Sequence, residues 1–155
     1  MTQDIFELAN QYLDAGKGGE AMRLFHELAE QGRVDAMHSI AHSHLYGVAV
    51  PEDHNLAFRW FTRAAAGGCP QAMYHLGLCN ALGYGTKKNP ALAVKWYRES
   101  AERGDVDAVY QVGRCYEDGV GVAPDVDEAR KWYRRAAAMG QEEARERLAT
   151  GENGE

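Results

Sequence analysis

The chain has 155 residues, about the length of one globular domain. Its net charge is -6, and 45% of its residues are hydrophobic. It has no apolar run long enough to cross a membrane and no signal-peptide pattern at its start. We therefore expect a cytoplasmic protein with no membrane partner. The acidic charge balance, without a basic stripe, argues against nucleic acid as a partner. Cys69, Cys79 and Cys115 are an odd number outside a secretory context, so we expect reduced thiols.

The same residue types recur along the chain with a period of 36 positions. Glycines, alanines and tryptophans each form such a series: Gly32, Gly68, Gly104 and Gly140; Ala36, Ala72, Ala108 and Ala144; Trp60, Trp96 and Trp132. Three series with one period indicate a repeat architecture, which must be identified before any local motif is interpreted. Residues 105–140 are the clearest copy of the repeated unit.

Two helices can be read within residues 105–140. Apolar residues at helical spacing define each buried face: Ala108, Val112, Cys115 and Tyr116 for the first helix, and Ala129, Trp132, Tyr133, Ala136 and Ala137 for the second. The glycine-rich segment at 119–122 interrupts the helix between them. Asp125 is the expected N-cap of the second helix, with Glu128 completing a capping box. The unit is predicted to be a helix hairpin.

The fold class predicted for the chain is all-α, a right-handed α-solenoid of four helix-turn-helix repeats with a C-terminal capping helix. The expected parts are hairpins at about residues 1–32, 33–68, 69–104 and 105–140, a capping helix at 141–150 and a disordered tail at 151–155. Residues 1–150 would form a single domain. In the first hairpin we expect helices at 4–14 and 20–31, joined by a loop that is four residues shorter than the others. Asp53 and Asn89 are the expected N-caps in the second and third hairpins.

The fourth copy carries a recognisable motif. Its residues are Val112-Gly113-Arg114-Cys115-Tyr116-Glu117-Asp118-Gly119-Val120-Gly121-Val122, then Ala129, Trp132-Tyr133, Ala136-Ala137 and Gly140. This motif resembles the Sel-1-like repeat family, a relative of the tetratricopeptide repeat. The third copy departs from the pattern at Asn80 and Ser100, and the second at Ala41, His44 and Ala49. The resemblance implies a helical solenoid, and members of the family mostly supply adaptor surfaces.

The sequence predicts no catalytic residues, no cofactor and no enzyme activity. The paired loop glycines match neither a P-loop nor a dinucleotide-binding fingerprint. None of Ser39, Ser43 and Ser100 begins an S-x-x-K motif, and no activating partner is evident for the cysteines. The tryptophan series lies on an apolar helix face, so we interpret it as core rather than as an aromatic binding site.

Two histidines leave a metal site open as an alternative. His38 and His42 are spaced i, i+4 on one helix, a spacing that can hold two metal ligands. The sequence has no glutamate between them in the H-E-x-x-H manner, so we interpret them as surface or groove histidines and predict no bound metal.

The resemblance to tetratricopeptide-like stacks places the first helix of each hairpin on a concave face. Two positions of that helix are then exposed: one carries Phe6, His38, Tyr74 and Tyr110, and the other carries Asn10, His42, Leu78 and Arg114. Recurring aromatic residues outside the core favour a surface that binds a peptide or helix of a partner protein. Two alternatives stay open. Tyr74 and Tyr110 could be half-buried against the next hairpin, or the protein, a monomer or weak homo-oligomer, could self-associate through Ile5 and Phe6.

Overall fold

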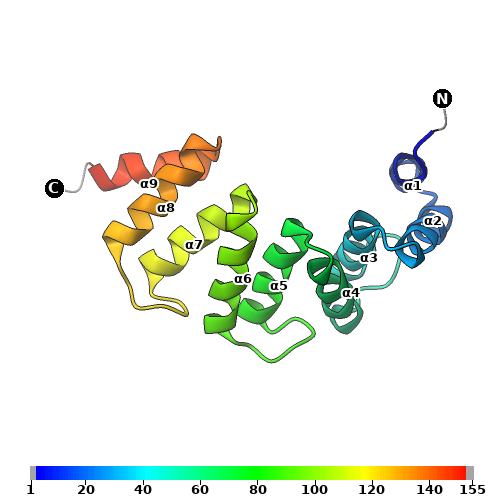
Figure 1. Cartoon of the computed structure of the whole chain (residues 1–155), viewed down its shortest axis with the longest axis horizontal. Coiled ribbons are helices and arrows are strands. Elements are labelled where there is room, and N and C mark those ends of the chain that lie inside the picture. Colours follow the sequence, from blue (N-terminus) through cyan, green and yellow to red (C-terminus); the bar gives the residue numbers. More distant parts are fainter. Residues whose placement is uncertain (1–2, 153–155) are drawn as a thin grey trace. The chain divides into compact units, whose positions relative to one another are not determined.

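The computed structural model describes residues 3–152, and every regular element within them is an α-helix (Figure 1). These helices are α1 (Ile5–Asp14), α2 (Gly18–Glu30), α3 (Val34–Tyr46), α4 (His54–Ala66), α5 (Pro70–Leu82), α6 (Pro90–Glu102), α7 (Val106–Asp118), α8 (Val126–Ala138) and α9 (Glu142–Glu152). Consecutive helices pair as antiparallel hairpins, with α9 after the fourth hairpin. The predicted all-α solenoid of helix hairpins is confirmed.

The chain divides into two compact units. Unit 1 holds the residues up to Ala72 together with Tyr84–Thr86, and unit 2 holds Met73–Gly83 and the residues from Lys87 onward. In unit 1, α1 packs on α2, α2 on α3, and α3 on α4; in unit 2, α6 packs on α7, α7 on α8, and α8 on α9. The single domain expected at residues 1–150 stays a prediction.

Two predicted boundaries are wrong by two residues. Helix α2 begins at Gly18 rather than at residue 20, because the chain already turns at Gly16, whose φ is +73°. Helix α9 continues to Glu152, past the predicted end at residue 150. The remainder of the predicted disordered tail, residues 153–155, lies outside the described residues.

The predicted N-caps are confirmed. The carboxylate of Asp53 accepts from the Leu56 amide at 2.9 Å, the side chain of Asn89 from Leu92 at 3.1 Å, and the carboxylate of Asp125 from Glu128 at 3.0 Å. The main-chain amide of each cap donates back to the last turn of the preceding helix: Asp53 to His44, Asn89 to Asn80 and Asp125 to Tyr116, over 2.7–2.9 Å. The predicted capping box is therefore wrong in one respect. The Asp125 amide that Glu128 would accept from is already bonded to Tyr116.

A small residue of the first helix lies against an aromatic ring of the second in each later hairpin. A Cβ added at Gly113 would meet the Tyr133 ring at 2.7 Å, and one added at Gly77 would overlap the ring of Tyr97. Both rings are almost fully buried, with 3% of their surface exposed. Glycine at these positions therefore lets the second helix approach until the ring fills the space between the backbones.

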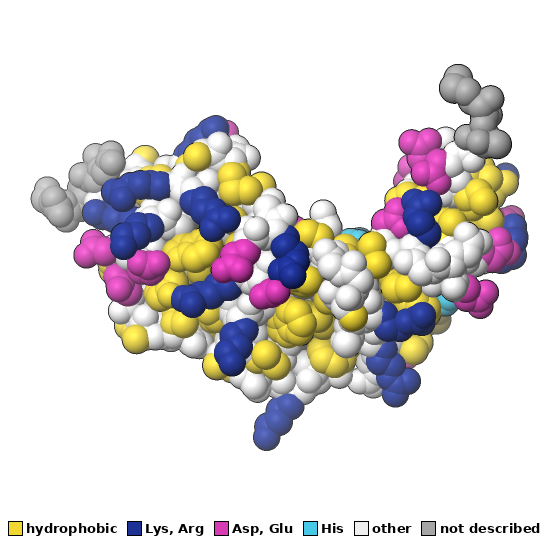
Figure 2. Space-filling view, in the orientation of Figure 1, with side chains coloured by type: hydrophobic (Ala, Val, Ile, Leu, Met, Phe, Trp, Pro, Cys, Tyr) yellow, Lys and Arg dark blue, Asp and Glu magenta, His cyan; other side chains and the backbone are white. Residues whose placement is uncertain are grey.

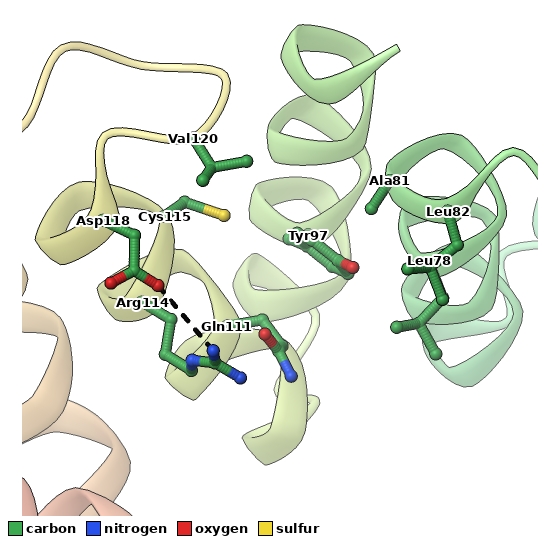
Figure 3. Close-up of a pocket in the computed structure, with 9 residues that line it drawn as sticks. All are labelled: Leu78, Ala81, Leu82, Tyr97, Gln111, Arg114, Cys115, Asp118 and Val120. Carbon is green, nitrogen blue, oxygen red and sulfur yellow. Dashed lines mark ion pairs between the residues drawn. The ribbon is translucent and has the colours of Figure 1, made fainter. Parts of the chain in front are cut away.

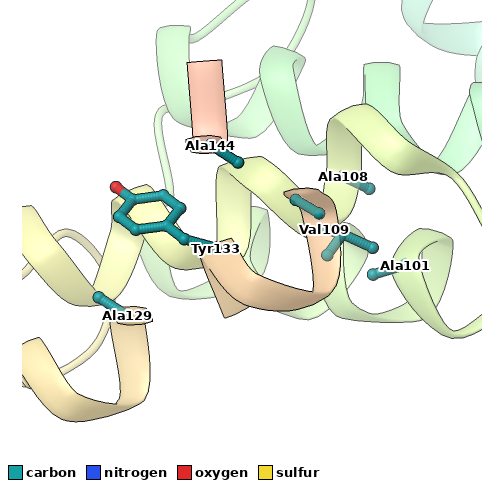
Figure 4. Packing of buried hydrophobic residues seen from close by; sticks show 7 residues of the cluster. Ala101, Ala108, Val109, Ala129, Tyr133 and Ala144 are labelled. Carbon is teal, nitrogen blue, oxygen red and sulfur yellow. The ribbon is translucent and has the colours of Figure 1, made fainter. Parts of the chain in front are cut away.

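The core of unit 2 is built from small residues around these rings. One cluster contains Ala101, Ala108, Val109, Ala129, Tyr133, Ala136 and Ala144, from four consecutive helices (Figure 4). A second contains Ala93, Val94, Tyr97, Val112 and Cys115. The tryptophans, predicted as core, are instead half-buried: Trp132 packs against the clusters, and Arg135 covers its ring at 5.3 Å. The neighbouring Tyr133 is buried in the core, where its ring lies against Gly113 of the first helix.

The loop of each later hairpin packs on the start of a preceding second helix. A Cβ at Gly85 would overlap the main-chain carbonyl of His54, and one at Gly121 the carbonyl of Pro90. The equivalent loop residue in the second hairpin is Ala49, with a φ of +66° that side chains rarely adopt. The residue beneath Ala49 is Gly18, where an added Cβ would lie 2.5 Å from the Ala49 methyl, so this contact requires glycine at position 18. In this contact the glycine belongs to the helix (Gly18), whereas in the later hairpins the glycine belongs to the loop (Gly85 and Gly121).

We predict that Gly18 and Ala49 are energetically coupled. Gly18→Ala should destabilise the protein by about 1–3 kcal/mol, because it forces two methyl groups together. In an Ala49→Gly background the same change should cost at least about 1 kcal/mol less, since the Ala49 methyl that the new side chain would meet is then gone. Urea unfolding of the four variants measures this coupling.

The matched control is Gly19→Ala, because a Cβ at Gly19 meets nothing within 4 Å. That change should stabilise α2 by about 0.5–1 kcal/mol through helix propensity alone. An equal cost of Gly18→Ala in both backgrounds would show that the contact does not matter.

Candidate functional site

The side chains at the first of the two predicted binding positions pack against the second helix of their own hairpin. Each side chain is half-buried and lies against an aromatic ring of the second helix: Phe6 on Phe25 at 5.6 Å, His38 on Phe61 at 5.7 Å, Tyr74 on Tyr97 at 5.8 Å, and Tyr110 on Tyr133 at 5.6 Å between ring centroids. Such tilted pairs stabilise the hairpin. These four side chains offer one face to solvent and use the other for packing.

The second predicted position lines an open cavity in unit 2 (Figure 3). The cavity measures about 220 Å³ and lies between α5 and α7, with Leu78 on one wall and Arg114 on the other. Its remaining lining residues are Ala81, Leu82, Tyr97, Gln111, Cys115, Asp118 and Val120. Leu82 and Val120 are 52% and 46% exposed, so apolar surface is available at the rim. The arrangement suits a single apolar side chain beside a charged group.

Arg114 supplies the charge of this cavity. Its guanidinium lies 3.7 Å from Asp118 one turn along α7, and both side chains are about half exposed (43% and 48%). The Nε atom of Arg114 is buried and makes no hydrogen bond to any described residue. An ion pair this exposed is weak, so the guanidinium can exchange Asp118 for another carboxylate.

The equivalent position in unit 1 also lines a cavity. Asn10, His38 and His42 border a space of about 260 Å³ together with Leu13, Ser39 and Ser43. The imidazole of His42 lies 4.6 Å from the ring of Tyr46 between centroids, and burial lowers the pKa of His42. A neutral imidazole can both donate and accept a hydrogen bond, so His42 makes this cavity polar without adding a charge at neutral pH.

Tyr110 belongs to a third cavity, which is bordered by the capping helix. It measures about 350 Å³, and Glu143, Glu146, Arg147 and Thr150 of α9 line it with Tyr110. Glu117 accepts at 2.6 Å both from the hydroxyl of Tyr133 and from the guanidinium of Arg147. Burial raises the pKa of Tyr133 well above its usual value, and the hydrogen bond to Glu117 raises it further. Helix α9 is thus bonded directly beside the predicted site.

The predicted residues therefore divide into groups. Asn10, His38 and His42 share one cavity, Leu78 and Arg114 share another, and Tyr110 lines the third, whereas Phe6 and Tyr74 line none of these. Sequence reasoning missed Leu82 and Asp118, which lie one turn beyond Leu78 and Arg114 on the same helix face. Their helical spacing of i, i+4 would have identified them.

No three histidine, cysteine, aspartate or glutamate side chains within the described range lie close enough to hold a metal ion. The rings of His38 and His42 are 6.2 Å apart between centroids, and each also contacts an aromatic ring, Phe61 and Tyr46 respectively. Both imidazoles therefore have a packing role.

Charges of both signs mix on the molecular surface. On the face shown in Figure 2, basic side chains of the described residues are interspersed with acidic and hydrophobic ones. Within residues 3–152, no helix is both long enough and apolar enough to cross a bilayer.

The repeat pattern and the fold identify the family. Sel1 repeats match residues 34–69, 70–105 and 106–141, more than half of the chain. The chain belongs to the Sel1 repeat family, whose members generally serve as protein-interaction modules on a scaffold that is typically non-catalytic. The first hairpin lies outside these matches, in agreement with its shorter loop. A comparison with curated proteins finds no match.

Solved structures of the same type are similar over most of the chain. A protective antigen present in uropathogenic Escherichia coli strains, which displays an SLR fold, is 34% identical with a TM-score of 0.87, over 93% of this chain and 32% of that one. A Sel1 repeat protein from Oxalobacter formigenes is 34% identical with a TM-score of 0.84, over 90% and 57%. Cysteine rich protein B of Helicobacter pylori shares the fold at 20% identity and a TM-score of 0.65, over 83% and 92%. The chain spans about a third and just over half of the first two proteins.

We predict that the buried thiols make stability fall at alkaline pH. Burial raises the pKa of Cys79 and Cys115 from 9.0 to about 11. The unfolded chain therefore loses these protons first. Their contribution is complete below pH 9.0 and is lost as the pH rises to about 11. The free energy of unfolding should fall by about 1.4 kcal/mol per pH unit for each thiol.

Cys79→Ala tests this directly when urea unfolding is followed across that pH window. The variant should lose stability less steeply than the wild type, because one titrating group is gone, while its packing loss is the same at every pH. Parallel pH profiles for the two proteins would contradict the prediction. Tyr97 and Tyr133, whose pKa burial also raises, remain in both proteins.

Proposed function

We propose that this protein is a non-catalytic adaptor that binds a peptide or helix of a partner protein along the face formed by the first helices of its hairpins. The observation that carries the proposal is the recurrence of cavities at one repeat position. Asn10 and His42 line one between α1 and α3, and Leu78 and Arg114 line the other between α5 and α7. Membership of a family of interaction modules supports the same function.

The chemistry of the α5–α7 cavity specifies part of the partner. Leu78, Leu82 and Val120 offer apolar contact, and Arg114 offers a guanidinium with a weak internal partner. The segment that fits has an apolar side chain next to an aspartate or glutamate. The apolar residue fills the cavity, and the carboxylate replaces Asp118 on Arg114, where two parallel hydrogen bonds can form. Tyr74 and Tyr110 contribute their exposed ring faces within unit 2, and Phe6 and His38 contribute theirs within unit 1.

Self-association is the second candidate, favoured by one observation: Ile5 at the start of α1 is 45% exposed. Light scattering distinguishes the two, since self-association requires a mass that rises with protein concentration. The proposed location is the cytoplasm, which is supported by the buried thiols of Cys79 and Cys115 outside any disulfide.

The predicted result of a peptide-display selection on the wild-type protein is enrichment of an apolar residue beside an acidic one. Fluorescence anisotropy should then show about tenfold weaker binding of the selected peptide to Arg114→Gln, because a charge-assisted hydrogen bond is lost. Leu78→Asp should weaken binding at least as much, since it places a charge in the apolar wall.

The matched control is Arg134→Gln, which removes an exposed arginine of α8 that lines none of the described cavities. Binding to this variant should change less than about twofold, and circular dichroism should show that all variants keep their helices. If the peptides bind Arg114→Gln and Leu78→Asp as tightly as the wild type, the interface does not lie at the α5–α7 cavity.

A further inference from the structure

The second helices of the last three hairpins each carry one tryptophan, and these tryptophans differ in the side chain that lies over the ring. Arg63 places its guanidinium 4.4 Å from the centroid of the Trp60 ring, and Arg135 lies 5.3 Å from that of Trp132. In both cases the arginine follows its tryptophan by three positions on the same helix. These distances are those of cation–π contacts. The chain thus covers two of its three tryptophans with its own arginines.

The third tryptophan, Trp96, has a glutamate at that position. Trp96 is half-buried and lines an open cavity of about 270 Å³ with Leu92, Lys95 and Glu99. All four residues lie on α6, and none of them lines the α5–α7 cavity. Replacing arginine with glutamate takes away the internal cation and puts a carboxylate beside the indole.

The residues that line the Trp96 cavity include one acidic side chain, Glu99, and one basic side chain, Lys95. Glu99 is 47% exposed and accepts from the guanidinium of Arg103 at 2.7 Å, one turn further along α6. An exposed i, i+4 pair of this kind is weak, and one oxygen of the carboxylate remains for a second donor. Leu92 and the exposed Lys95 complete the wall.

We propose that the Trp96 cavity binds an arginine side chain of a partner protein. The guanidinium lies over the indole ring, as those of Arg63 and Arg135 do within this chain, and donates to Glu99. Arginine fits better than lysine, because its planar group can stack on an aromatic face and hydrogen-bond at its edge at the same time. This surface lies on a second helix, so it is independent of the function proposed for the first helices.

The test uses the three indole N–H signals of the protein in an NMR spectrum, each assigned from its Trp→Phe variant. The probe is a short peptide of glycines with one arginine, acetylated and amidated at its ends. The same peptide with citrulline in place of arginine has nearly the same shape but no charge. We expect the arginine peptide to shift the Trp96 signal far more than those of Trp60 and Trp132, and the citrulline peptide to bind at least about three times more weakly.

The matched variant is Glu99→Arg, which gives the third hairpin the residue found in the second and fourth. It should reduce the peptide affinity by about tenfold or more, since the protein's own arginine then covers Trp96 and repels the probe. Glu99→Gln keeps the shape and should have a smaller effect in the same direction. The proposal is overturned if Glu99→Arg binds the arginine peptide as the wild type does, or if all three indole signals shift equally.

Discussion

The contact between a small residue of one helix and an aromatic ring of the next is the constraint on which the hairpins depend. Gly113 under Tyr133, and Gly77 under Tyr97, let the helix backbones approach until the rings become part of the core. The same buried rings support the predicted binding positions, since Tyr74 rests on Tyr97 and Tyr110 on Tyr133. Tyr97 also lines the α5–α7 cavity, so packing and surface are made by one side chain.

Much of the fold could be predicted from the sequence, because repetition multiplies weak signals. One helical pattern is ambiguous, but the same pattern at a fixed period, with glycine at Gly32, Gly68 and Gly104 after each second helix, defines a hairpin array. The N-caps at Asp53, Asn89 and Asp125 were likewise predictable from residue type and position. These features are local, and local preferences can be read along the chain.

The site could be predicted only in part, because depth within a helix face depends on packing. Periodicity put Trp132 and Tyr133 on one apolar stripe, yet only Tyr133 is buried, against Gly113 of the first helix, and Trp132 remains half-buried with Arg135 over its ring. Similarly, the two exposed positions of the first helices looked equivalent. In unit 2, Leu78 lines the α5–α7 cavity, while Tyr74 packs against both core clusters. The spacing of residues along the sequence predicts which helix face a side chain lies on, but not how much of that side chain its neighbours bury.

The exchange between Gly18 and Ala49 limits how the repeats of this chain could be recombined. The loops of the third and fourth hairpins both place a glycine over the carbonyl of a residue that has a side chain, so their sequences are interchangeable at this contact. The loop with Ala49 lies so close to the start of α2 that residue 18 has to be glycine. A chimera that moved it one repeat later would set its methyl group over His54, and duplication of the second hairpin would create the same clash at its own junction. Equal length is therefore not enough to make two repeats modular.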